Sequence, residues 1–376
     1  MNKLRVTTIV GTRPEIIRLS RVIPRLDEYF DHTLVHSGQN YDYELNEIFF
    51  KDLSLRKPDI FLDASGANAA QTIAKVIEKS DSFFSEHPQD AVLILGDTNS
   101  ALSAISAKRR KIPIFHMEAG NRSFDQRIPE EINRKIVDHI SDINLPYTKI
   151  ARDYLISEGI KPDQIIKTGS PLDEVINFYK ENINSSKILS DLELQEKHFF
   201  LLSSHREENI DTDNFNKLIQ LIEKLIDEFK LPILISTHPR TRKRIEKEKI
   251  DLPKLAIMHK PLSFSDYSKL QTTAKAVLSD SGSITEESSI LNFPALNIRE
   301  AHERPEGFEE AAVMMTGLEF DRVLDGIRIL SKQDRGEKRS INIVDDYLSP
   351  NLSEKIVRII LSHVNFINQR VWKKDI

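Results

Sequence analysis

The chain has 376 residues, 39% of them hydrophobic, and carries a formal net charge of -5 with a pI near 6.2. This length suffices for two domains with a core each, and the acidic balance argues against a general nucleic-acid-binding protein, although it allows a local basic pocket for phosphate. There is no cysteine, which excludes disulfides, thiolate catalysis and cysteine-bound metals. No apolar run approaches a membrane span, and Val6 to Val10 is too short for a signal peptide, so we expect a cytoplasmic protein without a membrane partner.

Strand-like and helix-like segments alternate through the first half of the chain. A buried strand is predicted at 4–10, and it leads through a turn at 11–15 into an apolar helix that Pro24 is expected to end or kink. Further strands are predicted at 32–36, 91–95, 112–116, 143–145 and 165–166, and helices at 43–53, 69–84, from 129, and at 149–158. Such alternation predicts an α/β fold with a doubly wound parallel sheet.

The second half repeats this alternation after a polar stretch. Residues 182–197 are rich in Ser, Asn and charge and lack a clear strand, so we interpret them as the stretch between domains. Strands are predicted at 199–202, 232–236, 276–279 and 294–298, and helices at 213–228 and 353–367. The expected division is therefore 1–181, 182–352 and a C-terminal segment, 353–376, whose helix packs back across the molecule.

One run of nineteen residues, HMEAGNRSFDQRIPEEINR from His116 to Arg134, concentrates carboxylates, arginines and amides. Glu118 follows a buried strand, at the sheet edge that faces the ligand crevice in open α/β sheets. Glu130 lies near a positive helix N-terminus and four residues before Arg134, so the environments of the two glutamates differ, as an acid/base pair requires. The alternative is an ordinary solvated helix start. On another face of the helix, Ile132, Ile136 and Ile140 recur every four residues.

Other polar residues follow predicted strands. Arg13, in the turn GTRPE, and backbone N–H groups there suit an anion, although the turn is neither a Walker A loop nor a dinucleotide fingerprint. Asp97 follows the strand 91–95, at the same sheet edge as Glu118. Both features also have a structural explanation. The turn GTRPE could merely connect a strand to a helix, and Asp97 could be an ordinary helix N-terminal residue.

In the second half, His205 and His238 each come just after a predicted strand. In DSGSITEE, from Asp280, small residues enter a helix, where backbone N–H groups can approach a phosphate and an acidic residue one turn later can bind ribose hydroxyls. The alternatives are satisfied structural histidines and an ordinary helix N-cap. The histidines lack the close spacing of metal ligands, so we predict no metal site and no Mg²⁺.

Together the motifs GTRPE, GDT, EAG, PEEINR, HREEN, DSGSITEE and ERPEG, which span nearly the whole chain, resemble those of the non-hydrolysing UDP-N-acetylglucosamine 2-epimerase family. The resemblance implies two Rossmann-like domains facing a cleft in the glycosyltransferase-B arrangement, a C-terminal helix on the first domain, a homodimer and no cofactor. It places the catalytic residues at Asp97, Glu118, Glu130, Arg134 and His205. It places the UDP-sugar contacts at Arg13, His238, Ser281, Gly282, Ser283, Glu287 and Arg304.

Within the family, the chain is more similar to enzymes that form UDP-N-acetyl-L-fucosamine, for surface polysaccharide, by inverting C2 of UDP-2-acetamido-2,6-dideoxy-L-talose. The similarity lies in residues 37–47, 116–134, 236–242 and 297–307. Bacterial glucosamine epimerases usually have a histidine where Asn40 stands and a longer loop between EAG and PEE. UDP-N-acetylglucosamine nevertheless remains the alternative substrate.

The chemistry that the resemblance implies does not need a redox cofactor. The C2 proton of an aldose is not acidic, so UDP is expelled from C1 as that proton is removed, which leaves a 2-acetamidoglycal; return of the proton to the other face and re-addition of UDP invert C2. Positioned carboxylates and cationic groups on the diphosphate would promote these steps. The sequence does not identify the carboxylate that removes the proton. Other hypotheses are a UDP-sugar-dependent glycosyltransferase, a hydrolysing relative and a non-catalytic UDP-sugar sensor.

Overall fold

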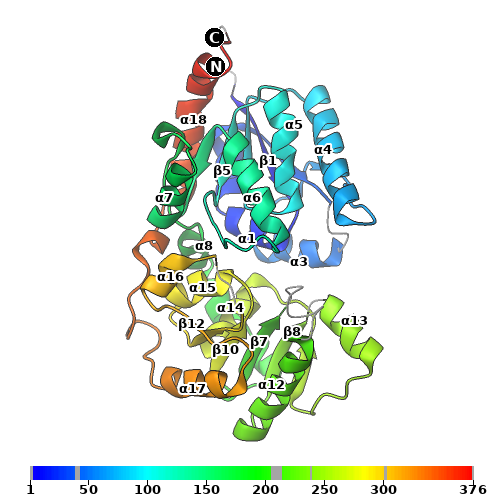
Figure 1. Ribbon diagram of the computed structural model, residues 1–376, viewed down its shortest axis with the longest axis vertical. Helices are drawn as coiled ribbons and strands as arrows, with labels where there is room; N and C mark the ends of the chain where they lie inside the picture. Colours follow the sequence, from blue (N-terminus) through cyan, green and yellow to red (C-terminus); the bar gives the residue numbers. More distant parts are fainter. Residues whose placement is uncertain (1–2, 39–42, 205–213, 238, 300–302, 375–376) are drawn as a thin grey trace. The chain divides into compact units, whose positions relative to one another are not determined.

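The computed structural model describes residues 3–38, 43–204, 214–237, 239–299 and 303–374. The chain divides into two compact units. Unit 1 comprises Met1–Phe178 and Asp346–Ile376, and unit 2 comprises Tyr179–Asp345. Each unit contains a parallel sheet with helices packed against it, which confirms the predicted α/β class (Figure 1).

The sheet of unit 1 has six parallel strands in the order β3-β2-β1-β4-β5-β6. They are β1 (Arg5–Val10), β2 (Asp31–His36), β3 (Ile60–Phe61), β4 (Ala91–Leu95), β5 (Ile114–Met117) and β6 (Ile143–Leu145). The sequence predicted β4 and β6 with these bounds because both are buried throughout and therefore read as continuous apolar runs. The strand order reverses between β1 and β4, and loops at such a switch point form the ligand crevice of Rossmann-like sheets.

The helices of unit 1 differ from the prediction at Pro24. The single helix expected before Pro24 is two helices, α1 (Arg13–Leu19) and α2 (Val22–Tyr29), and Pro24 lies in the first turn of α2, where a missing N–H costs little. The other helices are α3 (Tyr43–Asp52), α4 (Ala69–Glu86), η1 (Asn99–Leu102), α5 (Ser103–Arg109), α6 (Pro129–Ile140), α7 (Lys149–Ser157), η2 (Pro162–Gln164), α8 (Leu172–Phe178), η3 (Asp345–Tyr347) and α18 (Leu352–Arg370).

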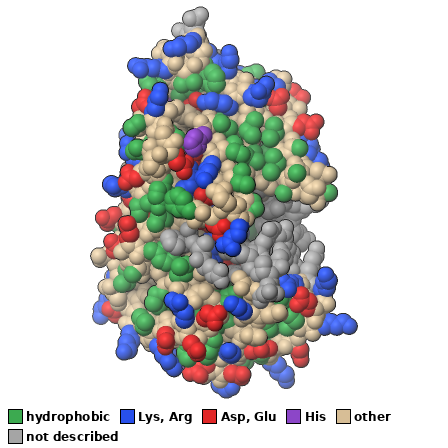
Figure 2. All heavy atoms as spheres, in the orientation of Figure 1, with side chains coloured by type: hydrophobic (Ala, Val, Ile, Leu, Met, Phe, Trp, Pro, Cys, Tyr) green, Lys and Arg blue, Asp and Glu red, His purple; other side chains and the backbone are tan. Residues whose placement is uncertain are grey.

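Helix α6 buries its polar face. Glu131, Arg134 and Asp138 are buried, whereas Ile132 and Ile136 are 53% and 36% exposed. Helices α4, α5 and α6 pack side by side on unit 1. Hydrophobic side chains gather on the surface over these three helices (Figure 2). The apolar periodicity therefore marks an outward face of α6, and the residues that enter the unit are mostly polar or charged, with Val137 as the apolar exception.

Unit 2 has six parallel strands in the order β12-β11-β10-β7-β8-β9, which is the same winding as unit 1 when read from β9. Its strands are β7 (Phe200–Ser204), β8 (Ile233–Thr237), β9 (Ala256–His259), β10 (Ala276–Ser279), β11 (Ala295–Asn297) and β12 (Met314–Met315). Its helices are α9 (Lys180–Ser185), α10 (Ile188–Asp191), α12 (Asn214–Phe229), α13 (Pro239–Glu248), α14 (Phe264–Thr273), α15 (Ser283–Leu291), α16 (Pro305–Glu309) and α17 (Phe320–Leu330). The stretch 182–197 thus contains helical turns, anchored by buried Ile183 and Ile188. The switch point lies between β7 and β10.

The C-terminal segment returns to unit 1, and α18 packs on α2. It docks on the loop 168–171, where Ser349 Oγ donates to Thr168 O at 3.0 Å. Gly169 has a φ of 89°, and a Cβ at this position would lie 1.9 Å from Ser349 Oγ, so only glycine fits. Among the described residues, no helix is both long and apolar enough to cross a membrane.

Candidate active site

Glu118 is held at the carboxyl edge of the unit 1 sheet, just after β5. Its backbone is left-handed, with a φ of 64°. Arg18 Nη1 donates to Glu118 Oε2 at 2.5 Å, and Asn121 Nδ2 donates to Oε1 at 3.1 Å. The side chains of Arg18 and Glu118 are only 8% and 11% exposed, so solvent screens this ion pair little. The sequence reading missed Arg18, because its partner lies 100 residues away in the chain.

Asp97 follows β4 and is bound by helix α6. Arg134 Nε donates to Asp97 Oδ2 at 2.7 Å, and Asn133 Nδ2 donates to the Asp97 carbonyl at 2.9 Å. Arg134 Nη1 also donates to the buried Glu131 at 3.0 Å. Glu130, the expected neighbour of Arg134, lies partly exposed in the first turn of the helix. The motif PEEINR therefore acts here mainly through Glu131, Asn133 and Arg134, which face inward.

The loops that carry Asp97 and Glu118 touch each other. Strands β4 and β5 are neighbours, and Gly96 N donates to Met117 O at 3.0 Å beyond their ends. A Cβ on Gly96 would lie 3.7 Å from Glu118 Oε2. The structure thus brings these two carboxylates and their two arginines together in one cluster, at one sheet edge.

The turn after β1 joins this cluster through Glu15, a residue that the sequence reading did not single out. The buried Glu15 carboxylate accepts hydrogen bonds from Gly11 N at 2.5 Å, Thr12 N at 3.2 Å and Thr98 Oγ1 at 2.6 Å. Burial raises the pKa of Glu15 to about 7, against the opposing effect of these hydrogen bonds. Glu15 therefore ties the GTRPE turn to the loop of Asp97 across the switch point.

Arg13 begins α1 beside this turn, and its guanidinium carbon lies 5.6 Å from the centre of the Phe49 ring. The side chain is partly exposed. Its position after β1 is compatible with the predicted contact to an anionic ligand.

In unit 2, the corresponding edge carries small hydroxyl residues. Ser281 and Gly282 lie between β10 and α15, Ser283 is the first residue of α15, and all three are partly exposed. The hydroxyls of Ser281 and Ser283 share a hydrogen bond of 2.9 Å. Helix α15 begins here, so its N-terminal N–H groups and its dipole favour an anion.

The acidic and basic residues near this edge are engaged within unit 2. Glu287 Oε2 accepts a hydrogen bond from Gln271 Nε2 at 2.6 Å, one turn into α15. Arg304, expected to contact UDP-sugar, forms a buried ion pair of 2.7 Å with Glu286. His205 and His238 lie outside the described residues.

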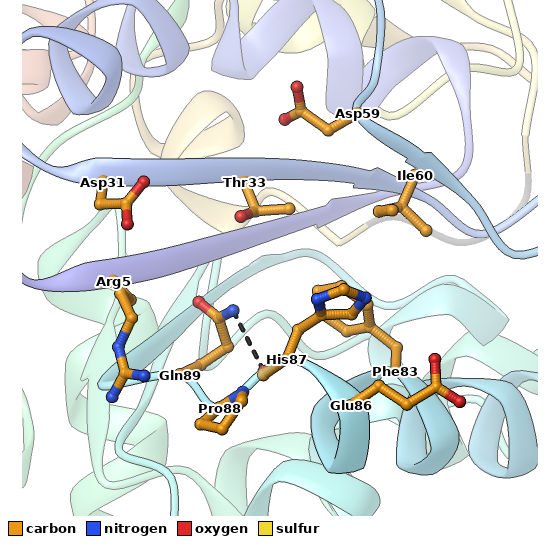
Figure 3. A pocket seen from close by; sticks show the side chains of 10 residues that line it. All are labelled: Arg5, Asp31, Thr33, Asp59, Ile60, Phe83, Glu86, His87, Pro88 and Gln89. Carbon is orange, nitrogen blue, oxygen red and sulfur yellow. Dashed lines mark hydrogen bonds between the residues drawn. The ribbon is translucent and has the colours of Figure 1, made fainter.

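Two further features of the described residues bear on the site. No group of three His, Asp or Glu side chains among them is placed to hold a metal ion. A cavity of about 400 Å³ lies at the opposite, amino-terminal edge of the unit 1 sheet, lined by the strand starts Arg5 and Asp31 and by His87 after α4 (Figure 3). It is therefore remote from the edge that carries Asp97 and Glu118.

Known proteins are similar to this chain in sequence and in fold. The family described as UDP-N-acetylglucosamine 2-epimerase matches residues 25–361. The structure of UDP-N-acetylglucosamine 2-epimerase from Rickettsia bellii is 51% identical, with a TM-score of 0.92, covering 99% of this chain and 100% of that chain. The enzyme of Methanocaldococcus jannaschii, solved in complex with UDP-GlcNAc and UDP, is 30% identical, with a TM-score of 0.88, covering 96% and 100%. A UDP-2,3-diacetamido-2,3-dideoxy-D-glucuronate 2-epimerase of Pseudomonas aeruginosa is 32% identical, covering 86% of this chain and 92% of the relative.

Proposed function

Because the chain belongs to the UDP-N-acetylglucosamine 2-epimerase family, whose members are isomerases, we propose that it inverts C2 of a UDP-N-acetylhexosamine by elimination and re-addition of UDP. The observation that carries this proposal is the cluster at the carboxyl edge of unit 1. Two carboxylates, Asp97 and Glu118, lie there on loops that contact each other, and each is ion-paired with a nearly buried arginine. A substrate that loses and regains a proton on opposite faces needs such positioned acid and base groups.

The reaction balances without an added oxidant. One carboxylate takes the C2 proton, the C1–O bond to the diphosphate breaks, and UDP leaves with the electron pair, which yields the 2-acetamidoglycal. A proton then returns to the opposite face of C2, and UDP adds back to C1. We assign Asp97, Glu118 and Glu130 as candidate acids and bases and Arg134 and His205 as stabilisers or proton carriers, and we leave the identity of the first base open.

For the nucleotide, we propose that the diphosphate binds at the start of α15, with Ser281, Gly282 and Ser283. The support is local, since this helix starts at the switch point of unit 2, where Rossmann-like sheets bind ligands. We propose that Glu287, one turn later, binds ribose hydroxyls. Arg13, His238 and Arg304 complete the proposed UDP-sugar contacts.

As substrate we propose UDP-2-acetamido-2,6-dideoxy-L-talose, with formation of UDP-N-acetyl-L-fucosamine for surface polysaccharide. The support is the sequence similarity in residues 37–47, 116–134, 236–242 and 297–307. The relatives bind or act on different sugars, UDP-GlcNAc in Methanocaldococcus jannaschii and a diacetamido-glucuronate in Pseudomonas aeruginosa, so the family accommodates several. UDP-N-acetylglucosamine is the alternative.

The experiment that tests this function is NMR of the purified protein in heavy water with each of these UDP-sugars. We expect deuterium at C2 of the sugar during turnover, and faster conversion of the L-talose derivative than of UDP-GlcNAc. Product that retains its original C2 hydrogen would contradict the elimination path. Conversion of UDP-GlcNAc alone would replace the proposed substrate by the alternative.

We also propose that the protein is a homodimer joined through the outward face of α6. Ile132 and Ile136 are exposed there, and partly buried Ile73, Ile105 and Ile140 continue the apolar surface. Exposed isoleucines on one face can pack against the same residues of a second copy, which suits a two-fold contact. Sedimentation velocity should show a dimer that Ile132→Asp together with Ile136→Asp converts to monomer. A monomeric wild-type protein would contradict this proposal.

A further inference from the structure

Behind the two carboxylates of unit 1 lies a buried charged network centred on His116 of β5. His116 Nδ1 lies 2.8 Å from Asp138 Oδ1, and His116 Nε2 lies 2.8 Å from the Gly96 carbonyl oxygen. Asp138 Oδ2 is bound by Arg122 Nη1 at 2.8 Å and by Gly120 N at 3.2 Å. The side chains of His116, Asp138 and Arg122 are at most 1% exposed. No step of the proposed reaction uses this network.

The partners of His116 require protons on both of its ring nitrogens. A carbonyl oxygen only accepts, so Nε2 must donate to Gly96 O. Asp138 accepts from Arg122 and Gly120 on its other oxygen, as a carboxylate does, so Nδ1 donates to Oδ1. Burial alone would lower the pKa of His116, but the hydrogen bond and the charge of Asp138 outweigh it and raise that pKa above its ordinary value.

This imidazolium connects the three segments of unit 1 that carry candidate catalytic groups, namely β5, the loop after β4, and α6. It belongs to β5, two residues before Glu118. It holds Gly96 O, one residue before Asp97, while Gly96 N is held by Met117 O. Its partner Asp138 lies on α6, one turn after Arg134. Both backbone polar groups of Gly96 are therefore hydrogen-bonded, and the residue is fixed between the two carboxylate-bearing loops.

We propose that His116 is a positioning residue that remains an imidazolium in the working enzyme and sets the relative placement of Asp97, Glu118 and Arg134. The inference rests on the proposed function for its kinetic consequence only. The charged groups around the ring are Asp138 of α6, Arg122 of the turn after β5 and, further out, Asp97 after β4. Glu158, at the end of α7, binds the far side of Arg122 with oxygen–nitrogen distances of 2.6 and 2.8 Å. The two cations of this network are thus matched by Asp138 and Glu158.

The protonation state is tested on the wild-type protein without substrate. Selective ¹⁵N labelling of histidine, with His116 assigned by difference from His116→Gln, should show both ring nitrogens protonated from neutral pH to well above the ordinary histidine range. A ring that becomes neutral near the ordinary histidine pKa would overturn the proposal. If His116→Gln does not fold, the His116 signal is identified by elimination among the exchange-protected rings, with His32→Gln and His36→Gln assigning the other two histidines that are buried in the described residues.

The positioning role is tested by His116→Gln, which keeps one donor but no charge. We expect kcat, measured as C2 deuterium exchange, to fall on the order of 10-fold to 100-fold, because small misplacements of reacting groups are costly. KM and UDP binding should change less than about threefold, since no nucleotide contact is altered. A lower melting temperature with unchanged kcat would reduce His116 to a structural residue and overturn the role.

A matched control uses the same substitution at the other edge of the unit. His87 is exposed and follows α4, beside the cavity of Figure 3, so His87→Gln should leave kcat unchanged. If wild-type protein exchanges no C2 hydrogen with any UDP-N-acetylhexosamine, the proposed function fails while the protonation result still stands. If wild type is active and His116→Gln equals it, only the positioning role fails.

Discussion

The two units wind their six strands in the same order but present different chemistry at the same edge. In unit 1 that edge holds Asp97 and Glu118, each bound by an arginine of a nearby helix. In unit 2 it holds Ser281, Gly282 and Ser283 at a helix start. The fold fixes where a ligand can approach, and the side chains decide what happens there. The edge of unit 1 suits proton transfer, and that of unit 2 suits an anion.

The largest effect is expected from Glu118→Gln. It removes a proton-transferring carboxylate but keeps the shape of the side chain and one acceptor oxygen for Arg18, while the new amide NH2 cannot accept from Asn121, so turnover should fall about 10²-fold to 10⁴-fold while UDP still binds. Deuterium exchange at C2 and calorimetric UDP titration measure the two properties separately. Wild-type turnover would remove Glu118 from the mechanism. A loss of UDP affinity as large as the loss of turnover would contradict the assignment of proton transfer to the edge of unit 1 and of UDP binding to the edge of unit 2.

Arg18→Met tests the ion pair that holds Glu118. It removes the arginine that pairs with a nearly buried carboxylate, so unfolding of unit 1 should become easier by about 3–5 kcal/mol. Trp372, the one tryptophan of the chain, lies in unit 1 and reports this transition by fluorescence. The matched control is Arg25→Met, which breaks the exposed pair with Glu28 and should cost at most about 1 kcal/mol. Equal effects of the two variants would show that the ion pair of Arg18 and Glu118 stabilises unit 1 no more than an exposed ion pair does.

Glu15 makes the edge of unit 1 sensitive to pH. Its pKa is raised from 4.5 to about 7 by burial, so between these values the folded protein binds a proton that the unfolded chain has lost. Its contribution to stability is therefore complete below about pH 4.5 and is lost as the pH rises through 7, a change of about 3 kcal/mol. Glu15→Gln should remove this loss, as measured by urea unfolding at pH 5 and pH 8. Wild type and variant with the same pH dependence would contradict it.

The smallest effect is expected in unit 2, from Ser281→Glu. A carboxylate at a helix N-terminus favours the helix but competes with a bound diphosphate, so UDP affinity should fall about 10-fold to 100-fold without loss of stability. Ser190→Glu, on exposed Ser190 of α10, is the matched control and should bind UDP normally. Unchanged affinity in Ser281→Glu would place the diphosphate elsewhere.

The sheets could be predicted because buried parallel strands are continuous apolar runs. Strands β4 and β10 were predicted with their observed bounds. Strands β3, β9 and β12 were not predicted, since β3 and β12 have two residues each and the four residues of β9 are all only partly buried. The prediction therefore followed burial, and all three missed strands lie at sheet edges.

For the candidate site, the sequence indicated where polar residues follow strands but not how they pair. Arg18 reads as one charge in an apolar helix until the fold brings it to Glu118. Helix spacing suggested Glu130 as the partner of Arg134, whereas the inward residue is Glu131. His116 stands among apolar strand residues, and only the tertiary structure shows that its ring is held by Gly96 and Asp138.

The return of the C-terminal segment to unit 1 has a consequence for biosynthesis. On the ribosome, every residue of unit 2 is made before α18 emerges to meet α2, so unit 2 can complete its fold first, although it is encoded later than most of unit 1. A chain that ends just before residue 346 should consequently contain a folded unit 2, whereas unit 1 would lack α18 and could not complete its fold.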